Sequence, residues 1–268
     1  MVALTVLSMV ECAASQRAAS PAASKQIVRL DRTHQIWIYR PQGRKGRRPL
    51  VLIGPAGSPL YSGMTLGSGD EPEHTPYVQA GCIVVSYDIS GPVSQGDRNP
   101  FPAIREFMDS DMGIKDAQRA LNYALRNIPE VDPHRVIAIG HSSAATLALQ
   151  VTESDPRITA CVAYAPVTDV PQRIGRVVSR IERSVPGFSA KVQQLSPATR
   201  AHRIHRPLFL FHANDDTNVP ATEVRQFAAA VPKSKLVEVP TGGHYNSMLQ
   251  QGMPAALKWL RSLGFMDK

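Results

Sequence analysis

A serine flanked by small residues is the first feature of the sequence that could carry out covalent chemistry. The residues Gly-His-Ser-Ser-Ala occupy positions 140–144, directly after an apolar run at 136–139 and directly before a helical pattern. A serine at a tight strand-to-helix turn has a strained backbone, and small neighbours let the turn close while its hydroxyl stands clear of the sheet. The turn predicts Ser142 as a nucleophile. There are two alternatives: Ser143 is the nucleophile, or Ser142 only caps the helix.

A base must accompany such a serine, because its hydroxyl becomes nucleophilic only when a positioned group removes the proton. Of eight histidines, His244 has the most suitable context: a Gly-Gly pair precedes it, in a loop between the apolar run at 235–239 and the last helical pattern. An exposed loop histidine without a chemical role is the alternative. We expect His212, at the end of another apolar run, to be structural, and the side chain of His141 to point away from the site.

An orienting carboxylate should fix the tautomer of the histidine and stabilise the imidazolium as it forms. Two adjacent aspartates, Asp215 and Asp216, follow the run at 207–212. One of them is expected to take this role and the other to form the turn. We choose Asp216, with Asp215 as the alternative, so that the chain order is serine, acid, histidine.

The surrounding pattern alternates between short apolar runs and amphipathic helical stretches. The runs lie at 50–53, 82–87, 136–139, 158–165, 207–212 and 235–239, and the helical patterns at 113–127, 143–152, 221–231 and 254–263. This alternation predicts an α/β fold, with a mostly parallel sheet covered by helices on both faces. Alternating polarity at 26–30 and 35–39 predicts an antiparallel hairpin at one edge of that sheet.

One segment, residues 171–194, interrupts the alternation. It carries four arginines and one lysine against Glu182 alone, with apolar residues at helical spacing. We interpret it as a short, cap-like helical insertion rather than a second domain. It could overhang the nucleophile, line an acyl pocket and favour anionic substrates through its positive charge. The alternative is an exposed amphipathic helix without substrate contact.

The amino terminus differs from the rest of the chain. Residues 1–10 are mostly apolar or small, and an Ala/Ser-rich stretch follows, but the positively charged start of a signal peptide is missing. Residues 1–24 are therefore expected to be a disordered tail or the remnant of a signal peptide, and residues 25–268 the folded domain. Both a cytoplasmic and an exported protein remain open.

The composition excludes several function classes. The chain has 268 residues, 43% hydrophobic and 19% charged, as in a soluble globular protein. Basic residues exceed acidic ones by eight but are scattered, so nucleic-acid binding is not expected. Three cysteines lack metal-ligand spacing, and no apolar run reaches the roughly 20 residues of a membrane-spanning helix. We expect no metal, no cofactor and no membrane span. The oligomeric state stays open.

These residues resemble an α/β-hydrolase, with the match extending from about residue 26 to about residue 263. The turn at Ser142 resembles the nucleophile elbow. Residues 212–220 resemble the acid loop of the prolyl oligopeptidase and dienelactone hydrolase branches, in which the acid stands four places after a histidine and Val-Pro closes the loop. That register selects Asp216, although Ala213 departs from the usual glycine. The stretches at 131–136 and 195–197 also resemble the prolyl oligopeptidase catalytic domain.

Acyl transfer also needs two backbone amides aimed at the developing oxyanion. One is expected from Ser143, the residue after the nucleophile. Aligned with the His-Gly-x loop of the family, residues 54–58 offer the amide of Ala56, with Gly57 as the alternative, because Pro55 has no N–H. A plain turn without this role is also possible.

The resemblance implies a serine hydrolase that cleaves carboxylic esters through an acyl-enzyme, with a small ester as its substrate. A serine peptidase of prolyl oligopeptidase type, acting on short peptides, is the alternative. A non-catalytic binding protein is a third class, since a fold does not determine a function.

Overall fold

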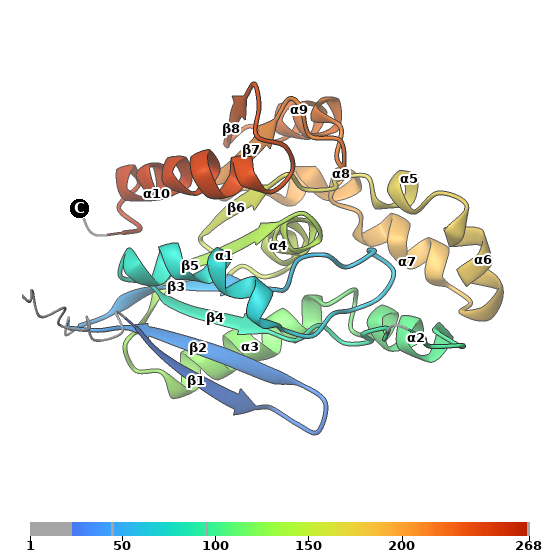
Figure 1. Cartoon of the computed structure of the whole chain (residues 1–268), viewed down its shortest axis with the longest axis horizontal. Helices are drawn as coiled ribbons and strands as arrows, with labels where there is room; N and C mark the ends of the chain where they lie inside the picture. The colour runs from blue at the N-terminus through green and yellow to red at the C-terminus, as the bar shows by residue number, and fades with distance from the viewer. Residues whose placement is uncertain (1–22, 44–45, 95, 267–268) are drawn as a thin grey trace, which may run out of the picture.

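The computed structural model describes residues 23–43, 46–94 and 96–266, and the interpretations of residues 1–22 lie outside this range. Eight strands in the described part form one sheet in the order β1-β2-β4-β3-β5-β6-β7-β8 (Figure 1). They are β1 Ala23–Arg29, β2 Gln35–Pro41, β3 Arg48–Ile53, β4 Ile83–Tyr87, β5 Val131–His141, β6 Ala160–Tyr164, β7 Leu208–Ala213 and β8 Ser234–Val239. The pairs β1–β2 and β2–β4 are antiparallel, and all other neighbours are parallel. The predicted mostly parallel sheet with an edge hairpin is confirmed.

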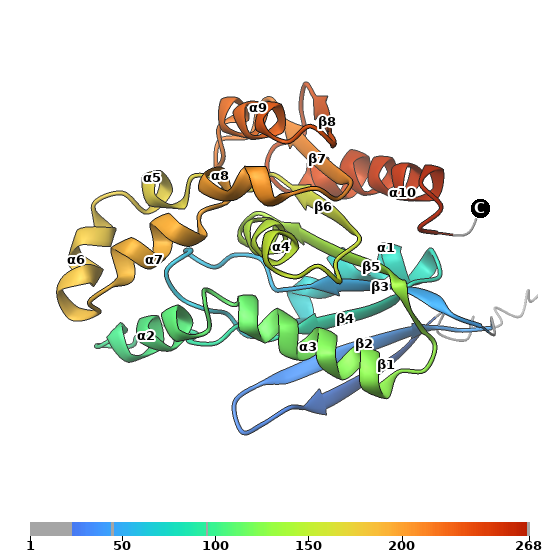
Figure 2. The same ribbon diagram turned by 180° about the vertical axis from the view of Figure 1, so that it is seen from behind.

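Helices cover both faces of the sheet because the central strands are apolar on both sides. In β3, Leu50 and Leu52 face one hydrophobic cluster while Val51 and Ile53 face the other. This is the continuous apolar pattern typical of buried parallel strands. The first face is covered by α2 Phe101–Asp109, α3 Ile114–Asn127, α4 Ser143–Ser154 and α9 Ala221–Ala230, and the second by α1 Glu71–Gln79 and α10 Met253–Ser262 (Figures 1 and 2).

The helices α1 and α2 are two of the observed helices that have no counterpart among the predicted helical patterns. Helix α1 contains two prolines, Pro72 in its first turn and Pro76 inside it, and its apolar residues show almost no helical periodicity. Such a sequence is typical of a loop, and only its packing of Tyr77 and Val78 on the sheet makes it a helix. Helix α2 is amphipathic, so its periodicity was available as a signal.

The segment at 171–194 forms three helices, α5 Val170–Ile174, α6 Val177–Ser184 and α7 Phe188–Leu195. After α7 the chain continues through α8 Pro197–Arg200 and the short turn η2 Ala201–Arg203. Buried side chains of all three helices, including Ile181 and Phe188, join the cluster that covers the first face of the sheet. The segment therefore packs on the main core. None of the helices in the described part of the chain is long and apolar enough to cross a membrane.

Candidate active site

Ser142 lies in a sharp turn between β5 and α4. Its φ is 55° and its ψ is −121°, a left-handed conformation that is rare for a residue with a side chain. Its amide donates to the carbonyl of Tyr164 at 2.9 Å, and its carbonyl accepts the amides of Ala145 and Thr146. A Cβ at Gly140 would lie 2.2 Å from the backbone of Ala144, so this turn requires glycine there. The small residues around Ser142 thus have the steric role that the sequence predicted.

Asp216 and His244 come together from two different loops. Asp216 follows β7, His244 follows β8, and 2.7 Å separates Oδ2 of Asp216 from Nδ1 of His244. The amides of Asn218 and Val219 donate to the other carboxylate oxygen at 2.7 and 3.1 Å. Burial opposes ionisation of Asp216, but the hydrogen bonds from His244 and from the two amides outweigh it and lower its pKa. The carboxylate is therefore ionised and oriented toward the imidazole.

The neighbouring Asp215 binds the loop that carries His244. Its two carboxylate oxygens accept the amides of Gly242 and Gly243 at 3.0 and 2.8 Å. From the sequence, Asp215 is expected to be a turn former or the alternative orienting acid, whereas in the structure it joins the two loops. The two adjacent aspartates thus have different contacts. Asp216 contacts the imidazole of His244, and Asp215 contacts the backbone of the two glycines that precede His244.

His141 lies beside His244 and not away from the site, so the expectation for its side chain is wrong. Its Nε2 is 3.0 Å from the carbonyl of His244, and the two imidazole rings have centroids 4.6 Å apart. Because a carbonyl only accepts, Nε2 of His141 must carry the proton. The other nitrogen, Nδ1, is 3.5 Å from Oε1 of Glu73 in α1. The residue before the predicted nucleophile therefore supports the backbone of the predicted base.

The hydroxyl of Ser143 holds the loop at 54–58 against α4. Its Oγ accepts the amides of Gly57 and Ser58, each at 3.0 Å. The amide of Gly57 is thus occupied, while the amide of Ala56, the predicted oxyanion donor of this loop, interacts with the carboxyl of Asp70 and acts to lower its pKa. Ala56 and Ser142 line the same cavity. From the sequence, Ser143 is expected to contribute its amide or to be the alternative nucleophile, and no sequence signal marks its side chain as a link between the two loops.

The cavity around Ser142 has a volume of about 550 Å³. Besides Ser142, His141, His244 and Ala56, it is lined by Gly57, Met64, Thr65, Gly67, Gly69, Asp70, Glu73, Asn218 and Tyr245. No residue of 171–194 belongs to this described lining, so the isoleucines and valines of that segment do not form an acyl pocket here. The segment contacts the lining indirectly, because Arg173 donates to the carbonyl of Asn218 at 2.7 Å.

A cavity of larger volume, about 720 Å³, lies elsewhere, and Lys191, Arg200 and Arg203 are among its lining residues. It does not contain Ser142 or His244, so volume alone does not identify the site. No group of three or more His, Cys, Asp or Glu side chains in the described ranges is arranged to hold a metal ion.

A model of the prolyl oligopeptidase family matches residues 71–260, well over half of the sequence. The chain belongs to the prolyl oligopeptidase family. Its structural neighbours show that it has the α/β-hydrolase fold, as the resemblance implied. A putative carbamate hydrolase, RutD of Klebsiella pneumoniae, is 36% identical over a 75-residue alignment that covers 25% of this chain and 28% of that protein.

Solved structures of peptidases and esterases share the fold. The acylaminoacyl peptidase of Pyrococcus horikoshii has a TM-score of 0.72 at 15% identity, over 90% of this chain and 42% of that one. The puromycin-hydrolyzing peptidase of Mycobacterium tuberculosis has a TM-score of 0.69 at 19% identity, over 93% and 41%. The esterase Est2 of Thermogutta terrifontis has a TM-score of 0.64 at 20% identity, over 92% and 97%. The chain thus spans about two-fifths of the two peptidases and almost all of the esterase.

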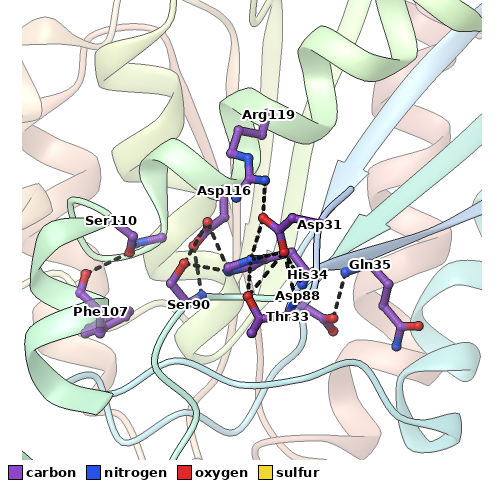
Figure 3. A network of polar contacts seen from close by, with 11 residues as sticks. Asp31, Thr33, His34, Gln35, Asp88, Ser90, Phe107, Ser110, Asp116 and Arg119 are labelled. Carbon is purple, nitrogen blue, oxygen red and sulfur yellow. Dashed lines mark hydrogen bonds and ion pairs between the residues drawn. The ribbon is translucent and has the colours of Figure 1, made fainter. Parts of the chain in front are cut away.

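A second group of Ser, His and Asp side chains in this protein has a different character (Figure 3). His34 Nε2 lies 2.7 Å from Ser90 Oγ, and His34 Nδ1 lies 3.1 Å from Asp31 Oδ1. However, Ser90 donates its hydroxyl proton to Asp116 at 2.8 Å, so His34 must donate to Ser90 and cannot act as its base. Ser90 is only 6% exposed. With Arg119 bonded to Asp31, the cluster fastens the turn after β1 to α3 and is structural.

Proposed function

We propose that the protein hydrolyses carboxylic esters through an acyl-enzyme on Ser142, with His244 as the base and Asp216 as the residue that orients it. The observation that carries this proposal is the 2.7 Å contact between Asp216 and His244 at the cavity that contains Ser142. An ionised carboxylate on Nδ1 fixes the imidazole with its lone pair on Nε2, which is the nitrogen that a serine hydroxyl needs.

In the first half-reaction, Oγ of Ser142 attacks the carbonyl carbon while Nε2 of His244 takes the hydroxyl proton. The amides of Ser143 and Ala56 stabilise the oxyanion. The tetrahedral intermediate collapses, the C–O bond to the alcohol breaks, and His244 returns the proton to the leaving oxygen. Water then attacks the acyl-enzyme by the same steps and releases the carboxylic acid.

The serine-to-histidine contact forms in the complex with substrate. No hydrogen bond joins Ser142 Oγ to His244 among the described residues, and in free enzymes of this class such contacts are often long and tighten when substrate binds. The alternatives have weaker support. The hydroxyl of Ser143 accepts two loop amides. Both carboxylate oxygens of Asp215 accept backbone amides, whereas Oδ2 of Asp216 lies on Nδ1 of His244.

An ester is the preferred substrate class because an alkoxide leaves with less help from an acid than an amine does. Peptide hydrolysis is the second candidate, favoured by the two carboxylates in the cavity wall, Asp70 and Glu73, which suit the free amino group of a peptide.

Labelling with a fluorophosphonate probe tests the nucleophile, because only an activated serine reacts readily with it. We expect peptide mapping to find the label on Ser142 and Ser142→Ala to abolish it. Turnover of 4-nitrophenyl esters, but not of aminoacyl anilides, supports esterase activity, and turnover of anilides supports the peptidase. Labelling of Ser143 would refute the assignment of the nucleophile. No labelling and no turnover would refute the proposal and favour a binding protein.

A further inference from the structure

A buried carboxylate and a buried imidazole face each other beside the candidate base. Oε1 of Glu73 in α1 lies 3.5 Å from Nδ1 of His141, and the two side chains are only 6% and 5% exposed. Nδ1 of His141 has no hydrogen-bond partner in the described part of the chain, and no described residue donates to the carboxylate of Glu73. Burial without a partner is costly for both groups, so this contact with each other is what compensates them.

The second nitrogen of His141 determines what this contact does. Nε2 donates to the carbonyl of His244 at 3.0 Å, so a neutral ring keeps its one proton there and turns the lone pair of Nδ1 toward Glu73. A lone pair and a carboxylate oxygen repel each other, so a proton must lie between them, carried by either Nδ1 or Oε1. In both cases the contact with Glu73 favours the ring orientation in which Nε2 donates to His244.

Ring contacts also join His141 to the loop of the base. The imidazoles of His141 and His244 have centroids 4.6 Å apart, and the ring of Tyr245 meets that of His141 edge-on at 5.5 Å. A rotation of His141 would therefore break its hydrogen bond to the backbone of His244 and disturb the rings on either side. Glu73 opposes such a rotation, because it contacts the ring nitrogen that the hydrogen bond leaves free.

Helix α1 is fixed in a way that gives Glu73 a defined position. Tyr77, one turn after Glu73, is fully buried, and its hydroxyl is hydrogen-bonded to that of Tyr164. The carbonyl of Tyr164 in turn accepts the amide of Ser142 at 2.9 Å. Within one turn, the same helix is thus linked to the backbone of the nucleophile and, through His141, to the backbone of the base.

We propose that Glu73 is a positioning residue, which acts through His141 to keep the imidazole of His244 in place for Ser142. The inference rests on the proposed function, because it concerns the base of the same reaction. Support of this kind matters because a displacement of about 1 Å can lower the rate of an enzyme about a hundredfold. Binding of a substrate amino group by Glu73 is the competing role, and the test separates the two.

The test uses a neutral ester, 4-nitrophenyl butanoate, which has no amino group for Glu73 to bind. Glu73→Met keeps the length of the side chain and removes the contact. We expect kcat to fall about tenfold with KM nearly unchanged, because both half-reactions need a correctly placed His244. The rate of labelling by the fluorophosphonate probe should fall by a similar factor. Glu73→Gln, whose amide can donate to Nδ1 of His141, should keep most of the rate.

A second substitution shows whether Glu73 acts through His141. His141→Phe keeps a ring against that of His244 but cannot donate to its carbonyl. In this background Glu73→Met should lower kcat by less than about twofold, because the contact that it removes is already lost. The matched control is Glu71→Met, two positions earlier in α1. Glu71 is 44% exposed, paired with Lys25 and absent from the cavity lining, so this variant should keep kcat.

The possible results are distinguishable. The inference is overturned, and the proposed function left intact, if Glu73→Met keeps kcat or raises only KM, if its loss is equally large with His141→Phe, or if Glu73→Gln loses as much. No turnover and no labelling of Ser142 in the unmodified protein overturns both. Where Glu73→Met does not fold, NMR of the ring nitrogens in the unmodified protein and in Glu73→Gln decides. A proton on Nε2 of His141 in both supports the inference, and a bare Nε2 overturns it.

Discussion

Glu153 in α4 carries a carboxyl group buried without a hydrogen-bond partner. Its side chain is 0% exposed, neither of its oxygens has a partner in the described part of the protein, and Nε of Arg200 lies 3.6 Å away. Burial raises its pKa from 4.5 to about 8, although Arg200 and Arg203 act against the shift. We predict that Glu153→Gln stabilises the protein at alkaline pH and much less at acidic pH.

The sign follows from proton binding in the two states. Between pH 4.5 and about 8 the unfolded chain has lost this proton and the folded protein keeps it. The stability of the wild type therefore falls as pH rises through this range and levels off above it. At 1.36 kcal/mol per pKa unit, the full rise in the pKa of Glu153 corresponds to a loss of about 5 kcal/mol in the free energy of unfolding. Glutamine does not titrate, so the variant avoids this loss.

Urea unfolding at several pH values between 5 and 8.5 measures the effect. The free energy of unfolding of Glu153→Gln minus that of the wild type should grow by about 3–5 kcal/mol from the lowest to the highest pH. Glu106→Gln is the control, because Glu106 in α2 is exposed and its loss changes the net charge equally. A difference that does not depend on pH, or that shrinks as pH rises, would refute the reasoning.

Three further predictions concern the site. Asp216→Asn should lower kcat by about 10⁴-fold, as loss of the orienting carboxylate does in a serine protease triad. Asp215→Asn should lower kcat by only about tenfold, because one of its two amide contacts survives. Equal losses of kcat in the two variants would contradict these different roles. Ser143→Ala should lower kcat about tenfold and change KM little, because the two loop amides lose their acceptor. Ser143→Thr, which keeps a hydroxyl, should partly restore kcat. Charge reversal at Arg176 and Arg180 should leave the ratio of kcat/KM for anionic and neutral esters unchanged, and a shift at low salt would show that their field reaches the site.

The sequence predicted those features of the fold that depend on neighbouring residues. The buried strands are recognisable because a parallel strand covered on both faces is a continuous apolar run, as at residues 50–53. The turn at Ser142 is recognisable because its steric requirement falls on residues within two positions of it. Asp216 and His244 could be proposed because each follows a strand that the pattern revealed.

The sequence did not reveal contacts between distant segments. Asp70 and Glu73 reach the cavity because α1 packs on the second face of the sheet, and nothing near them in the chain indicates this. The link from Ser143 to Gly57 and Ser58 spans about 85 residues of sequence and depends on two loops that meet only in the fold. The position of His141 beside Ser142 does not reveal where its side chain points, because its surroundings are set by Glu73 and by the loop of His244.

The loop before His244 shows how the structure changes the meaning of a motif. In the sequence, a Gly-Gly pair is read as flexibility that lets the histidine reach the site. In the structure, φ is 122° at Gly242 and 64° at Gly243, conformations that side chains disfavour, and both amides point at Asp215. Because His141 also holds the carbonyl of His244, the backbone is fixed on both sides of the imidazole. The glycines therefore serve to place the histidine, and its position depends on Asp215 and His141 as much as on Asp216.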